Sequence, residues 1–167
     1  MPSARTCEMS NPRDFFEKIV KPSYDEWQAD PLSEWKAKAA TSNADTMAER
    51  VFAYWNMRDR TQVAGAAFAS QYRTHLRQNV CADFGLVWDV HDGHKHAVLN
   101  RANRQVTTSD QTGVGRMGWG EGGFGEGVYG GGDQIVVQLD DGSKRALSAV
   151  MLNVMEMWEQ ILTGMRL

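Results

Sequence analysis

The chain has 167 residues, of which 42% are hydrophobic, and its formal net charge is -3 at pH 7. The length and apolar content suffice for one core, so we expect residues 1–167 to form a single domain. The slightly acidic charge argues against a surface built as a whole to hold nucleic acid, and no apolar run approaches the roughly 20 residues of a membrane span, so we expect a cytoplasmic protein without a membrane partner.

The first two thirds of the chain carry mainly helical patterns. Residues 1–10 lack hydrophobic periodicity and are expected to form a flexible tail. Asn11 followed by Pro12 is typical of a helix start, with an Asx cap and a proline at the first helical position. The clearest amphipathic pattern comes next, with apolar residues at the spacing of one helix face: Ala44, Met47, Ala48, Val51, Phe52 and Trp55. Apolar residues continue at helical spacing beyond Val80, so we predict helices over residues 11–103.

The last third of the chain changes character. Residues 111–132 hold eleven of the sixteen glycines and are expected to form a loop with regularly spaced aromatics. The turn sequence Asp140-Asp141-Gly142 follows an apolar run, which predicts a β-hairpin within residues 133–147. Apolar residues then recur at helical spacing up to Gly164, which predicts a C-terminal helix over residues 148–163. The predicted fold class is therefore mainly α, a helical bundle with a small antiparallel β-hairpin or sheet inserted before the C-terminal helix.

Three of the four histidines lie in the eight residues from Asp89 to His96. If one helix runs through Gly93, then Asp89, Asp92 and His96 share a face. A histidine that titrates near neutrality beside carboxylates suits general acid–base catalysis, so these three residues and Lys95 are candidate catalytic residues. The alternative is a solvated polar face with local ion pairs.

Two arginines follow the histidine run. Arg101 and Arg104 are candidate substrate-binding residues, because a guanidinium group can hold a phosphate or stabilise a developing anion.

The other two histidines of the run suggest a metal site as an alternative. His91 and His94 continue the apolar stripe and are expected to point inward, where Asp45 and Glu49 from another helix could supply carboxylates. Neither a Glu-x-x-His pair nor a His-Glu-x-x-His motif accompanies them. We therefore expect no metal and no cofactor, and buried histidines bonded to polar groups are the commoner arrangement.

The glycine-rich tract places an aromatic residue at every fifth position, at Trp119, Phe124 and Tyr129. These residues are further candidates for substrate binding, as a flap that closes over a base, a protein partner or a neighbouring subunit. The alternative is a structural loop whose aromatics anchor it to its own domain. A phosphate-binding P-loop is excluded, because no Gly-Lys-Ser/Thr follows and Glu121 and Glu126 would repel an anion.

The segment Asp83-Phe-Gly-Leu-Val-Trp-Asp89 through Lys95-His96-Ala-Val-Leu99-Asn-Arg101 resembles the HEPN-like helical families of bacteria. That resemblance implies a helical homodimer of the toxin or anti-phage type that acts on RNA. HEPN ribonucleases carry an arginine and then a histidine, with four to six residues between them, and this chain has no such pair. The resemblance therefore carries over only Lys95 and His96.

Three functions remain open from the sequence. The first is a HEPN-like cytoplasmic dimer that binds or cleaves RNA, with His96 as general acid or base, Asp89 or Asp92 orienting it, and Lys95 and Arg101 on phosphate. The second is a non-enzymatic interaction or assembly protein whose contact surface is the glycine-rich tract. The third is a metal-binding helical bundle.

Overall fold

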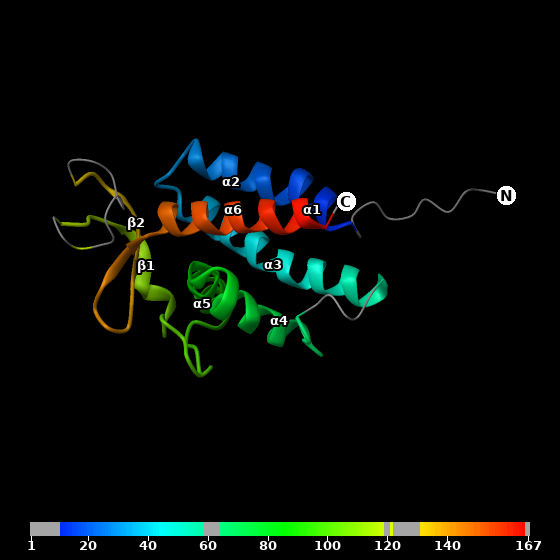
Figure 1. The fold of residues 1–167 in the computed structure, drawn as a ribbon. Helices are drawn as coiled ribbons and strands as arrows, with labels where there is room; N and C mark the ends of the chain where they lie inside the picture. Colours follow the sequence, from blue (N-terminus) through cyan, green and yellow to red (C-terminus); the bar gives the residue numbers. More distant parts are fainter. Residues whose placement is uncertain (1–10, 59–63, 119–120, 122–130, 166–167) are drawn as a thin grey trace.

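The computed structural model describes residues 11–58, 64–118, 121 and 131–165 (Figure 1). Helices make up most of these residues, and a small antiparallel sheet lies at one end of the bundle, before the C-terminal helix. The predicted fold class is thereby confirmed. The tail expected over residues 1–10 lies outside the described residues.

The first helix begins where the sequence predicts. Helix α1 spans Pro12–Phe15, and Asn11 caps it by accepting the N–H of Arg13 at 2.9 Å. One π-helical turn, η2 (Phe16–Val20), leads into α2 (Lys21–Gln28). The long helix α3 (Glu34–Arg58) then returns through the bundle and packs against α2 and α5.

Helix α5 (Ala82–His96) positions the histidine run, and it follows α4 (Ala69–His75) and the π-helical turn η4 (Leu76–Val80). The prediction of helix as far as residue 103 is wrong, because α5 ends at His96 and Ala97 takes a positive φ of 58°. Beyond that point the chain doubles back and pairs with itself, with the N–H of Leu99 donating to the carbonyl of Thr107 at 2.7 Å and a β-bridge joining Val98 to Thr108. Arg101 therefore lies on a loop that returns along α5.

The sheet contains three strands in the order β1-β2-β3, all antiparallel, and the 3-10 turn η5 (Ser109–Gln111) leads into it. Strands β2 (Gln134–Gln138) and β3 (Lys144–Ala146) form the predicted hairpin, with Gly142 at a φ of 87° in its turn. Strand β1 (Thr112–Gly115) lies within the segment predicted as a glycine-rich loop. That prediction is wrong for these four residues, because pairing with β2 satisfies their backbone groups.

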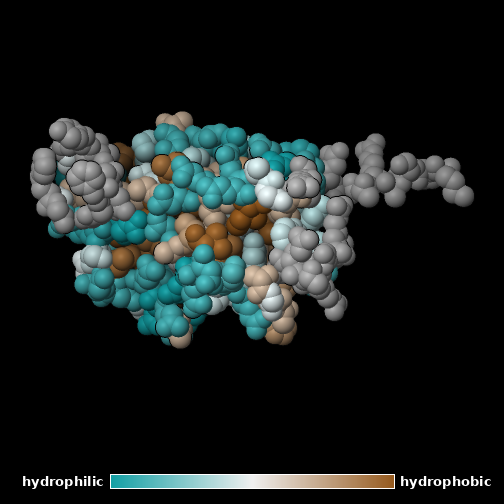
Figure 2. Space-filling view, viewed as in Figure 1, coloured by the Kyte–Doolittle hydropathy of each residue, from teal (hydrophilic) through white to brown (hydrophobic). Residues whose placement is uncertain are grey.

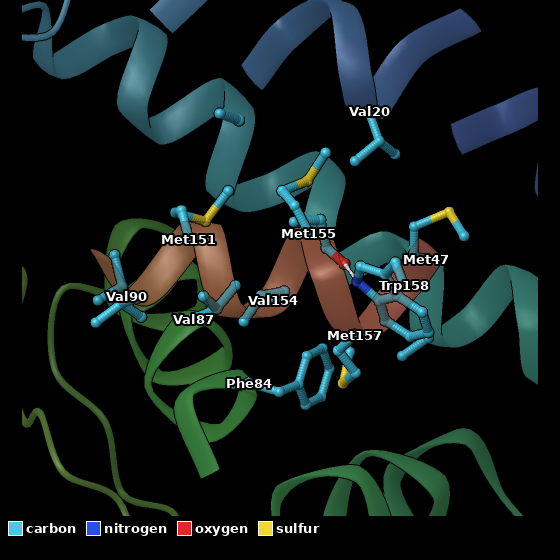
Figure 3. Close-up of a cluster of buried hydrophobic side chains, with 14 of the residues drawn as sticks. Val20, Met47, Phe84, Val87, Val90, Met151, Val154, Met155, Met157 and Trp158 are labelled. Atoms are coloured by element: carbon cyan, nitrogen blue, oxygen red, sulfur yellow. Dashed lines mark hydrogen bonds between the residues drawn. The ribbon is translucent and has the colours of Figure 1, made fainter. Parts of the chain in front are cut away.

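The core is centred on α6 (Leu147–Gly164), which follows β3 directly (Figure 3). Trp158 has no exposed surface, and its indole N–H donates to the carbonyl of Ala44 in α3 at 3.0 Å. Its ring meets that of Phe84 from α5 edge to face, with the centroids 5.7 Å apart. One tryptophan thus joins the three longest helices of the bundle.

The surface of this face of the molecule is largely hydrophilic, with apolar residues gathered along its middle, over the part of the bundle where α6 runs (Figure 2). Among the helices of the described residues, none has the length and apolarity needed to cross a membrane.

Candidate functional site

Asp89 and Arg101 form an ion pair whose carboxylate is completely buried. The side chain of Asp89 has no exposed surface, and its Oδ1 accepts a hydrogen bond from Nη2 of Arg101. Its other oxygen, Oδ2, accepts the backbone N–H of Gln105 at 2.5 Å. Burial raises the pKa of Asp89, while the Gln105 N–H and the Arg101 guanidinium act in the opposite direction. This carboxylate therefore holds the loop after α5 at two positions, Arg101 and Gln105.

The indole of Trp88 organises two guanidinium groups. Cζ of Arg101 lies 3.5 Å from the ring centroid of Trp88, and Cζ of Arg73 lies 5.8 Å from it. Arg73 is itself held by Asp45, with Nε–Oδ1 and Nη2–Oδ2 distances of 3.1 and 2.9 Å, and by Glu49 at 3.2 Å. Each arginine is thus anchored by a buried aspartate and placed beside an aromatic ring, which restricts its side-chain freedom before any ligand arrives.

A cavity of about 470 Å³ opens beside Trp88, between α5, the α4–η4 segment and the loop after α5. Among the described residues that line it there are two arginines, three carboxamides and a hydroxyl, and no Asp or Glu: Thr74, Arg77, Gln78, Ala82, Trp88, Arg101, Ala102, Asn103 and Gln105. Such a lining offers many hydrogen-bond donors and two guanidinium groups, of which that of Arg101 is paired with Asp89, so the cavity suits an anionic ligand.

Arg77 lies close to α5 because residue 85 is a glycine. A Cβ atom at Gly85 would stand 2.7 Å from both Cγ and Cδ of Arg77. Glycine in the middle of a helix costs roughly 0.5–1 kcal/mol relative to alanine. Gly85 therefore lowers the stability of α5. The absence of a Cβ at this position leaves the space that the Arg77 side chain occupies beside the cavity.

The guanidinium of Arg101 has unused hydrogen-bonding capacity. Its Nε and Nη1 are buried and have no hydrogen-bond partner within the described structure. Burial lowers the pKa of Arg101, whereas the charge of Asp89 raises it. A buried N–H left without an acceptor costs about 1–3 kcal/mol, so an acceptor from a ligand would remove a penalty already present in the free protein.

The predicted catalytic residues are not brought together. Asp89 is fully buried, Asp92 lies 3.7 Å from Nη2 of Arg101, and Lys95 and His96 are exposed at the end of α5. Helix α5 does run through Gly93, but seven residues separate Asp89 from His96, about 10 Å along the axis. Within the described residues no hydrogen bond or ion pair joins His96 to either aspartate. The basic end of α5 also has a structural role, because positive side chains in the last turn complement the helix dipole.

The two predicted phosphate-binding arginines have different positions. Arg101 lines the cavity, while Arg104 donates to the carbonyl of Arg101 at 2.8 Å and to Oγ1 of Thr107 at 3.1 Å. Arg104 therefore holds the loop in shape. Trp119, Phe124 and Tyr129 lie outside the described residues.

The candidate metal ligands surround a guanidinium group. Arg73 occupies the space between Asp45 and Glu49, and Nε2 of His91 lies 3.7 Å from Oδ2 of Asp45. Burial raises the pKa of Asp45 and Arg73 lowers it, while burial lowers the pKa of His91. In the described part of the chain no three His, Cys, Asp or Glu side chains are grouped so that they could hold a metal ion. His94 lies apart, with Glu34 and Lys38 around a second, small cavity.

Lowering the pH is expected to destabilise the protein through His94. Both ring nitrogens of His94 are buried without a partner in the described structure, and burial lowers its pKa from 6.5 to about 4. Between these two values the unfolded state binds more protons than the native state, so the free energy of unfolding falls as the pH falls from 6.5 towards 4. Allowing for the partial exposure of the ring, we expect a loss of roughly 1–2 kcal/mol.

Urea titrations at neutral and acid pH measure this effect. The variant His94→Gln should show a smaller loss of stability on acidification, whereas His96→Gln, which changes an exposed histidine of the same helix, is the control. Equal pH dependence of the wild type and His94→Gln would contradict the assignment.

Comparisons with known proteins do not assign this chain to a family. Neither the scan against protein-family models nor the searches of curated proteins and of solved structures found a significant match to this chain. The site thus rests on its own geometry.

The sequence reasoning missed Arg77, Trp88 and the carboxamides of the cavity. The available signal was Gly85, a glycine inside an otherwise regular helix three residues before Trp88. Its close partner Arg77 lies in a different helical segment, and only the folded chain brings the two together.

Proposed function

We propose that this protein binds RNA through the cavity beside Trp88. The observation that carries the proposal is the lining, in which Arg77 and Arg101 converge with three carboxamides and no described carboxylate takes part. Guanidinium groups form strong, charge-assisted hydrogen bonds with phosphate oxygens. Carboxamides present a donor and an acceptor side by side, which matches the edges of unpaired bases.

The proposal keeps the HEPN-like character that the sequence resemblance suggests. In this reading the protein is a cytoplasmic homodimer of the toxin or defence type, and Lys95 and His96 at the end of α5 are the residues to test for cleavage. Support for cleavage is limited to the exposed, basic end of that helix, whereas support for binding comes from the cavity. Sedimentation of the purified protein tests the dimer, and gel analysis of incubated RNA tests cleavage.

Replacing Arg77 by alanine is expected to weaken RNA binding by roughly tenfold or more, because a hydrogen bond to a charged group contributes about 1.5–3 kcal/mol. Fluorescence anisotropy with a labelled single-stranded RNA dodecamer measures the affinity. Arg116→Ala is the matched control, since it removes the same charge from a side chain that is 75% exposed and pairs with Asp133 beside the sheet.

The two variants separate local contacts from overall charge. If Arg77→Ala and Arg116→Ala weakened RNA binding equally, the affinity would depend only on the net charge of the protein. That result would contradict a binding site at the cavity. If the wild type bound no RNA, the proposal would be wrong. The alternative, a non-enzymatic interaction or assembly protein, would then be favoured.

A further inference from the structure

We infer that the cavity beside Trp88 receives the phosphorylated end of an RNA strand. The ligand inside the cavity is then one nucleotide with a terminal phosphomonoester, and not an internal segment of the RNA. This inference rests on the proposed function and names the part of the RNA that is recognised.

The size of the cavity fits one nucleotide. Its volume of about 470 Å³ lies in the range of about 300–1,000 Å³ that is typical of pockets for single small ligands. Proteins that follow a strand use a basic groove about 4–16 nucleotides long, with aromatic faces free for successive bases. Here the guanidinium of Arg101, with Cζ 3.5 Å from the ring centroid, already covers one face of Trp88.

The hydrogen-bond donors of the cavity exceed what an internal phosphate can use. Arg77 interacts electrostatically with Asp89, but no hydrogen bond or ion pair within 4 Å is found for it in the described residues, so its five N–H groups are available. Arg101 adds Nε and Nη1, which are buried and have no hydrogen-bond partner within the described structure. A phosphodiester offers two non-bridging oxygens and one negative charge, whereas a terminal phosphate offers three oxygens and a charge near -2 at pH 7. The terminal group therefore offers more acceptor oxygens and more negative charge to Arg77 and to the two unpaired nitrogens of Arg101.

The charges around the cavity disfavour a long polyanion. Asp92 lies 3.7 Å from Nη2 of Arg101, and Asp45 and Glu49 neutralise Arg73 on the neighbouring segment. The whole chain carries a formal net charge of -3. An extended RNA backbone leaving the cavity would therefore meet carboxylates, while one nucleotide end inside it would meet a lining without Asp or Glu among the described residues.

Isothermal titration with defined ligands tests the inference. The ligands are hexaadenylate with hydroxyl groups at both ends, the same RNA with a 5′-phosphate, the same RNA with a 3′-phosphate, and adenosine 5′- and 3′-monophosphate. We expect a phosphorylated end to bind at least tenfold more tightly than the all-hydroxyl RNA, and the two phosphorylated forms show which end is read. We also expect one mononucleotide to bind.

The variant Gly85→Ala tests whether Arg77 is the recognising group. Its added Cβ would displace the Arg77 side chain, so the preference for a phosphorylated end should fall to less than threefold. Gly164→Ala, at a helical glycine with nothing within 4 Å of an added Cβ, should keep the wild-type preference. Arg77→Gln provides the same test without a steric change at α5.

Each outcome decides between the two proposals. Equal affinity for the hydroxyl-ended and phosphorylated RNAs, or an unchanged preference in both Gly85→Ala and Arg77→Gln, would overturn the inference and leave RNA binding intact. Binding of none of the ligands by the wild type would overturn both.

Discussion

Replacing Asp89 by alanine is expected to lower the free energy of unfolding by about 3 kcal/mol. Loss of one member of a buried ion pair costs about 3–5 kcal/mol, because the remaining charge stays buried without a partner. The value lies at the lower end here because the Arg101 side chain remains 25% exposed. The same change leaves the N–H of Gln105 without its acceptor. Urea unfolding followed by circular dichroism measures the difference.

Asp92→Ala is the matched control for this experiment. Asp92 lies on the same helix and 3.7 Å from the same guanidinium, but its side chain is 23% exposed, so its loss should cost less than about 1 kcal/mol. The double variant Asp89→Ala/Arg101→Ala should recover part of the stability, since it removes the unpaired charge as well. Equal destabilisation by Asp89→Ala and Asp92→Ala would contradict the role of Asp89 as the anchor of the loop.

Replacing Trp158 by alanine is expected to cost about 4 kcal/mol, near the middle of the range for large aromatic residues in a core. The side chain is fully buried, contacts Phe84 edge to face, and donates its N–H to the carbonyl of Ala44 (Figure 3). Its removal leaves a large cavity and deletes the hydrogen bond to Ala44 at the junction of three helices. Thermal and urea unfolding should both show the loss.

Trp35→Ala removes the same side chain from the surface and serves as the control. Trp35 is 64% exposed and its only described ring contact is with the neighbouring Lys36, so we expect a change within about 0.5 kcal/mol. Similar effects of the two substitutions would mean that α6 does not form the centre of the core.

Trp158 and Asp89 differ in whether their replacement should affect ligand binding as well as stability. Trp158 stabilises the bundle and lies apart from the cavity lining, whereas Asp89 acts on both, because it fixes the loop that carries Arg101. We therefore expect Arg77→Ala to be stable but to lose ligand binding, and Trp158→Ala to be destabilised.

Local patterns in the sequence determined the fold class and several element boundaries. The cap at Asn11, the turn at Gly142 and the apolar spacing of α6 depend on contacts within a few residues, and each appears where it was predicted. The sequence also identified the histidine run as a candidate site. It did not show that Asp89 is buried while His96 is exposed, so that the two side chains do not form one catalytic group.

Only the tertiary structure decided where α5 ends and what its residues do. Helical spacing continues past His96 in the sequence, yet pairing of Val98 with Thr108 and capture of Arg101 by Asp89 are contacts between distant residues that outweigh local helix propensity. The approach of Arg77 to Gly85 is of the same kind, since it depends on how η4 packs against α5. The sequence by itself determined a helical bundle with a hairpin before its last helix, and the packing of its helices and loops assembled the two arginines into a site, because long-range contacts decide which polar groups are buried and which remain unpaired.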